Sequence, residues 1–401
     1  MAADMDLSSP PPSNLISRHD DVTLVERRAT VSVYLLCRVL IEVFNRSDIA
    51  SITLDMAAKL EEIVFTQLEG VDPDQIAVSS LRMANWRIYG QLLGIMSESN
   101  FASVSNRFLV NLEGLQQEET VKGPSDERDA KIELLILGMR HLRIRTHPET
   151  WPKSCEFMRS LARLFVNAHG QRIKQAYCYI FEKLLLPVAA NPGCDLSLPK
   201  WKEFLELVHS RLSPMLTKPR HWSAGFPLHV LLLCVSSKEN FSSQWLSVIN
   251  SLPARLKDRP TRAPALQAMC RLLWTYFFRY SDPPPTTLRR VEEVAKVALP
   301  PGKRTYLTTE PAVAEPLVQL IRMIGFKHPD VCFRSIIFPL IHSDIFLSGR
   351  ELKIEQMEPE KMVIGIRSFL AIVTDLENCD QLCPPFPTGS IPNPFTDNSA
   401  A

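Results

Sequence analysis

Apolar side chains recur at helical spacing along most of this 401-residue chain, and this spacing limits the fold more than any other feature. Between Leu266 and Phe277, successive apolar positions are 3, 1, 3, 1 and 3 residues apart, which places them on one side of a helix. The same spacing runs from Ile173 to Leu185. A helix with an apolar face is stable only when a neighbour covers that face, so we expect helices packed on helices.

Further segments carry the same pattern. They lie at residues 29–45, 50–68, 73–97, 128–145, 154–168, 199–213, 240–256, 287–299, 312–325 and 358–376. No segment alternates apolar and polar residues for the length of a strand, and Thr305–Thr308 is the one short strand candidate. Helix starts recur about every 20 residues, so a helix pair takes about 40, as in HEAT and armadillo repeats. We predict an all-α fold, an α-solenoid of HEAT/armadillo-like helix pairs, with a large helical bundle as the alternative.

Composition suggests where the helical part begins and ends. Residues 1–21 are predicted as a disordered N-terminal tail, 22–382 as a helical-repeat domain, and 383–401 as a proline-rich disordered tail. The polar segment from Gln116 to Asp129 is the predicted internal hinge or insertion. Prolines also stand inside apolar helical segments, which indicates kinked helices; they are Pro187, Pro227 and Pro339, the first two 40 residues apart.

Charge and hydropathy exclude several classes of protein. Lys and Arg number 45 against 44 Asp and Glu, so the net charge of +1 speaks against a nucleic-acid-binding domain, which is normally strongly basic. No segment has the roughly 20 consecutive apolar residues of a membrane span. The N-terminus has no basic start followed by an apolar core, so no secretory signal is predicted. Without a secretory signal, the cysteines are interpreted as reduced thiols; examples are Cys37, Cys178, Cys234 and Cys270. The tryptophans stand at helical spacing and are interpreted as core aromatics; examples are Trp86, Trp201, Trp245 and Trp274.

No pattern of catalytic, cofactor-binding or metal-binding residues meets its chemical requirements. Gly302-Lys303-Arg304-Thr305 resembles the end of a P-loop, but a phosphate-binding loop needs Ser or Thr directly after the lysine. Cys379 and Cys383 have the spacing of half a zinc site, without a second pair of ligands. No nucleophile elbow, zinc-protease helix or kinase catalytic loop is found. We predict no enzyme, no cofactor and no metal.

Basic clusters are the remaining polar feature. Arg140, His141, Arg143 and Arg145 close the helix predicted at 128–145, and a second cluster runs from Lys218 to Trp222. Cations at a helix C-terminus are favoured by the helix dipole, which is a sufficient structural explanation. The functional alternative is a basic strip that docks an acidic or phosphorylated partner protein. Both interpretations stay open at this point.

A longer resemblance adds to these patterns. Residues 348–367 have the sequence SGRELKIEQMEPEKMVIGIR. This segment resembles the N-terminal region of the Furry family of cell-morphogenesis proteins, in its fungal branch. Other similar pieces lie at residues 85–109, 133–145, 167–177, 218–228, 271–280, 300–305, 332–340 and 369–372. The pieces are collinear between about residues 29 and 389, which chance does not explain.

This resemblance implies a non-catalytic helical-repeat scaffold that works with NDR/LATS-type kinases and Mob coactivators in polarised growth. It implies a cytoplasmic location, at sites of polarised growth or the cell cortex, and it transfers no catalytic residues. Members of the family continue for many more repeats than this chain contains. His141-x-Arg143-x-x-Thr146 also fits the basic substrate pattern of these kinases, so Thr146 is a candidate phosphosite beside the partner-binding candidates Arg140, His141, Arg143 and Arg145.

A second functional class stays open on the residues alone. Transport adaptors of the karyopherin or adaptin kind are also stacked helix pairs. Import carriers usually have a strongly acidic net charge, and the +1 of this chain speaks against that class.

Overall fold

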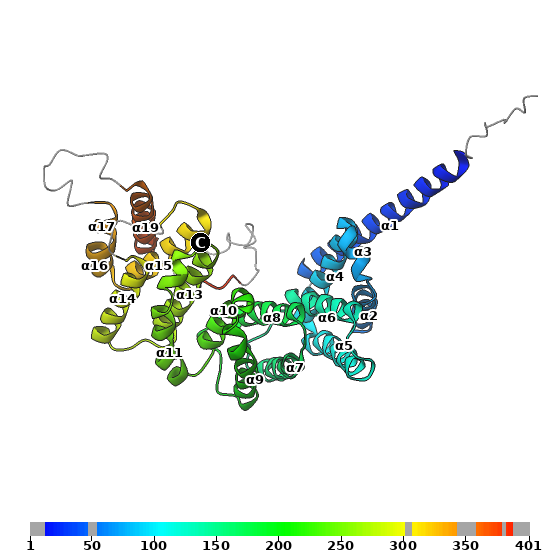
Figure 1. Cartoon of the computed structure of the whole chain (residues 1–401), viewed down its shortest axis with the longest axis horizontal. Helices are drawn as coiled ribbons and strands as arrows, with labels where there is room; N and C mark the ends of the chain where they lie inside the picture. The colour runs from blue at the N-terminus through cyan, green and yellow to red at the C-terminus, as the bar shows by residue number, and fades with distance from the viewer. Residues whose placement is uncertain (1–12, 47–53, 301–306, 343–357, 379–381, 388–401) are drawn as a thin grey trace, which may run out of the picture. The chain divides into compact units, whose positions relative to one another are not determined.

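The computed structural model describes residues 13–46, 54–300, 307–342, 358–378 and 382–387, and within these ranges every regular element is a helix (Figure 1). The predicted all-α fold is confirmed. The P-loop-like residues 302–305, the strand candidate's first residues and the first half of the segment 348–367 lie outside the described residues. The chain divides into two compact units, residues 1–143 and 144–401. The helical-repeat domain predicted at 22–382 includes parts of both units and stays a prediction.

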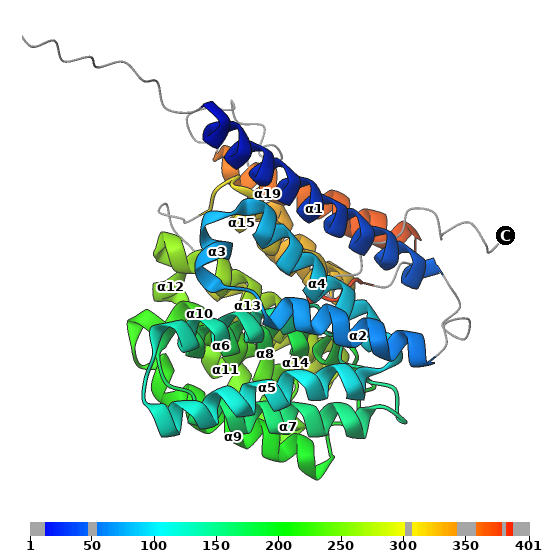
Figure 2. The same ribbon diagram turned by 90° about the vertical axis from the view of Figure 1, so that its right-hand side faces the viewer.

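Unit 1 is built around α4. Its elements are α1 (Ser13–Arg46), α2 (Leu54–Glu69), α3 (Pro73–Val78), α4 (Ser80–Ser99), α5 (Phe101–Lys122), α6 (Asp126–Gly138) and the 3-10 turn η2 (Met139–His141). Helices α1, α2, α3, α5, α6 and η2 all contact α4 (Figure 2). Leu92, Leu93, Phe108 and Leu112 are fully buried and form its core.

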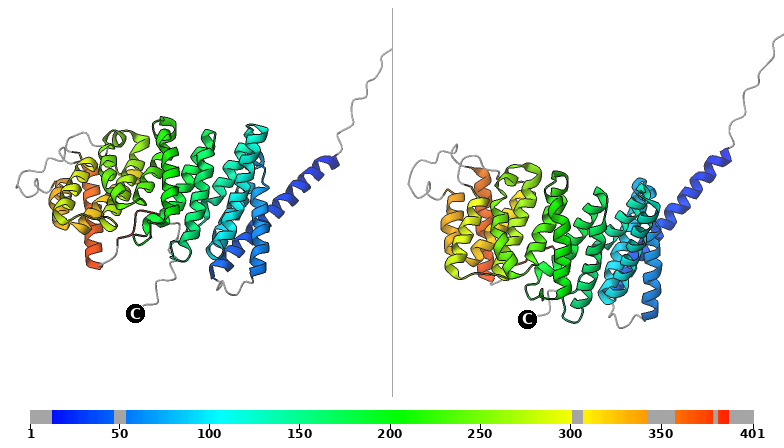
Figure 3. Two further views of the ribbon diagram at one scale, coloured as in Figure 1. Left: turned by 90° about the horizontal axis from the view of Figure 1, so that it is seen from below. Right: turned by 60° about the horizontal axis from the view of Figure 1, so that its bottom comes forward.

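Unit 2 stacks helices in two rows, as an α-solenoid does. Its elements are α7 (Trp151–Asn167), α8 (Gln171–Ala190), α9 (Pro199–Leu216), α10 (Pro219–Cys234), α11 (Lys238–Asn250), α12 (Pro253–Lys257), α13 (Arg259–Phe278), α14 (Pro284–Ala298), α15 (Pro311–Lys327), α16 (Pro329–Cys332), the π-helical η3 (Phe333–Ile337), α17 (Phe338–Leu340) and α19 (Pro359–Asn378). In one row α8, α10, α13, α15 and α19 each contact the next (Figure 3). In the other row α7 contacts α9, and α11 contacts α14.

Proline and capping residues decide where several helices begin. Many helices have proline in the first turn, where its missing N–H is not needed. The helix predicted at 73–97 is divided because Ser79 has an extended backbone, and its hydroxyl accepts a hydrogen bond from the Arg82 N–H. The helix predicted at 240–256 is also divided, because α11 ends at Asn250 and α12 begins at Pro253.

Two sequence predictions between α5 and α7 are wrong. The hinge predicted from Gln116 to Asp129 is mostly helical, because α5 continues to Lys122 and α6 begins at Asp126. The turn between them needs Gly123, whose φ of 79° is unfavourable for other residues. The helix predicted at 128–145 ends at Gly138, and Leu142 already has an extended backbone.

Helix α13 differs from its predicted amphipathic pattern. Its apolar stripe is buried as expected, but the opposite polar residues Arg271 and Thr275 are buried too. Arg271 Nη1 and Nη2 both lie 3.1 Å from Glu182 Oε1 on α8. Arg279 donates to the carbonyls of Val188 and Asn191 at the end of α8, at 2.9 and 2.5 Å. These bonds cross α10, which packs against both helices.

Internal prolines occur in four helices of the row that contains α13, and α9 of the other row also has one, Pro214. Pro187, Pro227, Pro264 and Pro316 lie inside α8, α10, α13 and α15. Each removes one intrahelical N–H donor, so each of these four helices loses one backbone bond. Pro339, the third predicted kink, lies in the unbroken helical run from Pro329 to Leu340, directly after the π-helical η3.

Parts of both predicted tails are ordered, and the predicted core residues are buried. Helix α1 begins at Ser13, inside the predicted N-terminal tail. In the predicted C-terminal tail Phe386 is buried, and its ring packs edge-on against Trp274 with centroids 5.3 Å apart. The tryptophans predicted as core residues are buried, as are the described cysteines other than Cys383. Cys379 lies outside the described residues.

Candidate partner-binding surface

The predicted basic strip does not form the end of an α-helix. Arg140 and His141 lie on η2, and Arg140 Nε donates a hydrogen bond of 2.8 Å to His141 Nε2. Because a guanidinium can only donate, this bond requires a neutral imidazole. His141 also packs directly on Gly94 of α4. The strip therefore begins with a histidine that holds the turn against α4.

The two remaining arginines of the strip are placed differently. Arg143 forms a 2.5 Å ion pair with Glu98 of α4, so its charge is neutralised within unit 1. Arg145 belongs to unit 2, where its carbonyl accepts a hydrogen bond from Ser154 Oγ. Thr146 accepts a hydrogen bond of 2.9 Å from Asn191 Nδ2 and is half-buried. Arg140 and His141 lie in the last turn of this helical run, where the helix dipole favours cations, whereas Arg143 and Arg145 lie beyond it.

Acid is expected to destabilise unit 1 through His141. Burial and the charges of Arg140 and Arg143 lower the pKa of His141 from 6.5 to about 4. The unfolded chain therefore binds the proton first as the pH falls, and stability present above pH 6.5 is lost between 6.5 and 4. We expect a loss of roughly 1–2 kcal/mol in the free energy of unfolding at pH 5 relative to pH 7. Hydrogen exchange of the α4 amides, corrected for the intrinsic effect of pH, measures it.

A His141→Gln variant is the control for this prediction. It retains a hydrogen-bond acceptor but does not titrate, so its α4 protection should change little over the same pH range. An equal pH effect in both chains would show that another group is responsible.

The second basic cluster is assembled by the fold of unit 2. We call it the α8–α10 basic cluster and define it as Lys174 of α8, Arg211 of α9, Lys218 at the N-terminus of α10, and Arg220 of α10. The backbone holds it together: Gln175 Nε2 donates to the Arg220 carbonyl, and Arg211 Nη2 donates to the Ala168 carbonyl at 2.6 Å. Lys218 and Arg220 are exposed, whereas Lys174 and Arg211 are half-buried.

The cations of this cluster act on one another. Burial and then the charges of Arg211, Lys218 and Arg220 lower the pKa of Lys174. Burial also lowers the pKa of His221, followed by Arg220, Lys174 and Lys218. Within the described part of the chain, no carboxylate lies in ion-pair distance of the four cluster residues. The cluster is a surface of uncompensated positive charge, which attracts anionic groups.

Neighbouring cations of unit 2 are paired with carboxylates. Between α7 and α9, Arg159 and Arg163 pair with Glu203 at 3.2 and 2.6 Å, and Lys200 pairs with Glu156. Every cation of that network has a carboxylate partner. The α8–α10 basic cluster, one helix further along the chain, differs in lacking them. Lys218 and Arg220 were visible in the sequence as part of the second cluster, but Lys174 and Arg211 were not, because neither adjoins another basic residue.

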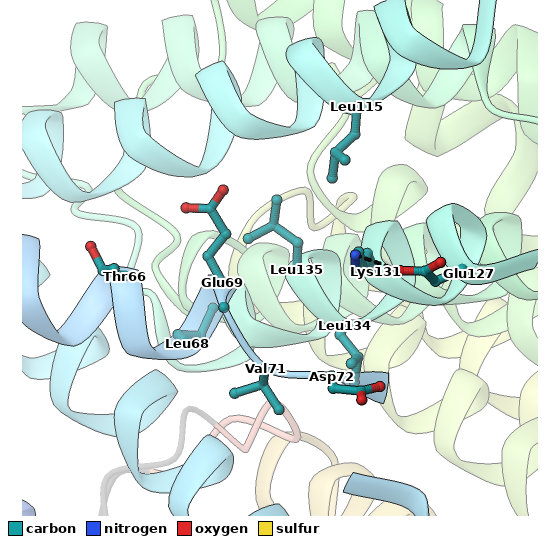
Figure 4. Close-up of a pocket in the computed structure, with 11 residues that line it drawn as sticks. Thr66, Leu68, Glu69, Val71, Asp72, Leu115, Glu127, Lys131, Leu134 and Leu135 are labelled. Carbon is teal, nitrogen blue, oxygen red and sulfur yellow. Dashed lines mark hydrogen bonds and ion pairs between the residues drawn. The ribbon is translucent and has the colours of Figure 1, made fainter. Parts of the chain in front are cut away.

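A pocket in unit 1 offers little chemistry. About 680 Å³ in volume, it is lined by residues from α2, the α2–α3 turn, α5 and α6 (Figure 4). Its charged groups include the ion pair of Lys131 with Glu127, 2.7 Å apart. No histidine, cysteine or serine lines it. Over the described ranges there is also no group of three metal-ligating side chains and no helix long and apolar enough to cross a bilayer.

Comparison with known proteins decides the family. The family model described as "Cell morphogenesis N-terminal" matches residues 26–401. This chain belongs to the Cell morphogenesis N-terminal family. The resemblance to the N-terminal region of Furry proteins is thereby confirmed, and the similar pieces at 85–109 and 133–145 include the contact of Gly94 with His141.

Two curated relatives are similar along most of the chain. Cell morphogenesis protein PAG1 of Saccharomyces cerevisiae is 31% identical over 365 residues, which is 89% of this chain and 15% of that protein. Cell polarity protein mor2 of Schizosaccharomyces pombe is 31% identical over 358 residues, which is 88% of this chain and 16% of that protein. This chain therefore spans about one sixth or less of the length of each relative. No solved structure matches it.

Proposed function

We propose that this chain is a non-catalytic, HEAT/armadillo-like scaffold segment that holds partner proteins during polarised growth and cell morphogenesis. Its family membership over residues 26–401 supports the process. The two rows of stacked helices in unit 2 support the scaffold role, because stacked helix pairs create extended surfaces for binding other proteins. We propose that it acts in the cytoplasm, at growth sites or the cell cortex.

An NDR/LATS-type kinase with its Mob coactivator is the partner that we propose. The resemblance to Furry proteins supports this choice, and the α8–α10 basic cluster supports the mode of contact. Uncompensated Lys and Arg side chains bind acidic or phosphorylated surfaces through charge-assisted hydrogen bonds. The cluster thus replaces the strip of Arg140, Arg143 and Arg145 as our first choice of contact, since Arg143 would have to release Glu98.

Affinity capture from a cell extract with matched charge variants tests this contact. Lys218→Glu/Arg220→Glu removes two exposed cations of the cluster and should lower recovery of the kinase and Mob protein at least tenfold, roughly the value of one or two charged hydrogen bonds. Arg82→Glu/Arg87→Glu makes the same charge change on exposed residues of α4 and should leave recovery unchanged.

The predicted strip is tested in the same experiment. We also compare a chain with Arg140→Glu, Arg143→Glu and Arg145→Glu. If this chain loses the kinase while the cluster variant retains it, the strip and not the cluster is the contact. If no bait recovers a kinase or Mob protein, the proposed function is wrong for this segment. Mass spectrometry of the captured chain also tests Thr146 as a phosphosite, and modification there requires loss of the hydrogen bond from Asn191.

A further inference from the structure

Helix α1 carries a second apolar stripe that its own unit does not cover. One face packs on α4 through Cys37 and Ile41, which are 5% and 2% exposed, and through the Thr30 carbonyl, which accepts a bond from Asn85. The other face carries residues that are all exposed and that we call the α1 seam; they are Val25, Ala29, Ser32, Leu36, Val39 and Val43. A helix that is apolar on two sides normally has a neighbour on each.

The spacing of the α1 seam specifies the kind of neighbour. Its positions are 4, 3, 4, 3 and 4 residues apart, which is the heptad spacing of a helix that pairs with another helix. Val25 is 64% exposed and Leu36 and Val39 are 58% and 59% exposed, so the seam is open along its length. From 25 to 43 it spans about 28 Å at 1.5 Å per residue.

The sequence of the seam fits an antiparallel copy of itself. When two seams align with residue numbers that sum to 68, Val25 faces Val43, Ala29 faces Val39 and Ser32 faces Leu36 of the other copy. A large side chain then meets a small one at two of the three levels, as close packing requires. A parallel pair would instead place Ala29 on Ala29 and Ser32 on Ser32, leaving gaps.

Charge favours the same arrangement. Arg28 and Glu42 flank the seam on the same edge, two heptads apart, and both are exposed. In the antiparallel register Arg28 of each copy lies opposite Glu42 of the other, which gives two reciprocal ion pairs. In a parallel pair Arg28 would face Val33. Helix α1 is also already ordered by α4, so pairing incurs little of the cost of helix nucleation.

We propose that the α1 seam is a self-association surface through which two copies of this chain pair as antiparallel helices. The pair is short compared with a standard interface, so its dissociation constant should be on the order of micromolar. This proposal is independent of the kinase contact, which lies in unit 2.

Sedimentation of the full 401-residue chain over a range of concentrations tests the pairing. The chain should shift from monomer to dimer, and Leu36→Glu/Val39→Glu should weaken the dimer at least about 100-fold while the melting temperature of the monomer is unchanged. Arg28→Glu should weaken it less, and adding Glu42→Lys should restore it. A chain that stays monomeric at all concentrations would overturn the proposal. So would a lower melting temperature of the Leu36→Glu/Val39→Glu monomer, because it would show that the chain covers its own seam.

Cysteine cross-linking tests the register. In a background with Cys379 and Cys383 changed to Ser, a mixture of Ala29→Cys and Val39→Cys chains should form a disulfide-linked heterodimer under mild oxidation. Neither variant alone should do so, because like positions lie about 15 Å apart in this register. Homodimers cross-linked at either position would indicate a parallel pair and contradict the proposal.

Discussion

Changing Arg107 to Ala should lower the free energy of unfolding of unit 1 by about 3–5 kcal/mol, because it leaves a buried carboxylate without its cation. Glu61 on α2 is only 2% exposed. Its Oε1 accepts hydrogen bonds from Arg107 Nε at 2.7 Å and from Ser103 Oγ at 2.6 Å, both on α5. The hydroxyl alone cannot balance the negative charge. Chemical denaturation, with hydrogen exchange of the α2 and α5 amides as the readout, measures the change in the free energy of unfolding.

Two companion variants separate charge from packing. Arg87→Ala removes an exposed arginine from α4 and should change stability by no more than about 0.5 kcal/mol. Glu61→Met/Arg107→Met removes both charges and should recover most of the loss, since a buried ion pair and apolar residues of similar volume are often equivalent. If Arg107→Ala costs no more than Arg87→Ala, the pair does not stabilise unit 1.

Changing Gly94 to Ala should destabilise unit 1 by about 3 kcal/mol or more, although alanine is the better helix former by up to about 1 kcal/mol. A Cβ at Gly94 would lie 2.4 Å from the carbonyl oxygen of His141 and 2.6 Å from its Cβ. Because the obstacle includes backbone, the turn η2 must move away from α4. Thermal unfolding of the two chains measures the difference.

Gly114 supplies the matched control. It lies in α5, and nothing is within 4 Å of the position of its Cβ. Gly114→Ala should therefore raise stability by up to about 1 kcal/mol through helix propensity alone. Opposite signs for the two substitutions are the expected result. The same sign for both would mean that α4 and η2 have room to separate without cost.

The helices could be predicted from the sequence because packing repeats at helical spacing. That spacing also identified the core tryptophans. It could not place Arg271, since a polar stripe has the same spacing whether it meets water or, as here, Glu182 of another helix. Nor could it end α6 at Gly138, because that end depends on the fit of His141 against Gly94, 47 positions earlier in the chain.

The candidate site was only partly visible for a related reason. Runs of basic residues stand out in a sequence, whereas Lys174 and Arg211 join Lys218 only when α8, α9 and α10 stack. A run of cations also says nothing of its counter-charges. Glu98 removes Arg143 from the predicted strip, and this pairing depends on the course of the chain after η2.

The arginines of α13 have a mechanical consequence. In a stack where each helix holds only its neighbour, a load applied at one end can peel the helices away one at a time. Arg271 and Arg279 reach past α10 to α8, so α10 cannot be pulled free while both bonds hold. Helices α8, α10 and α13 should therefore yield together, in one step, when tension is applied along the stack.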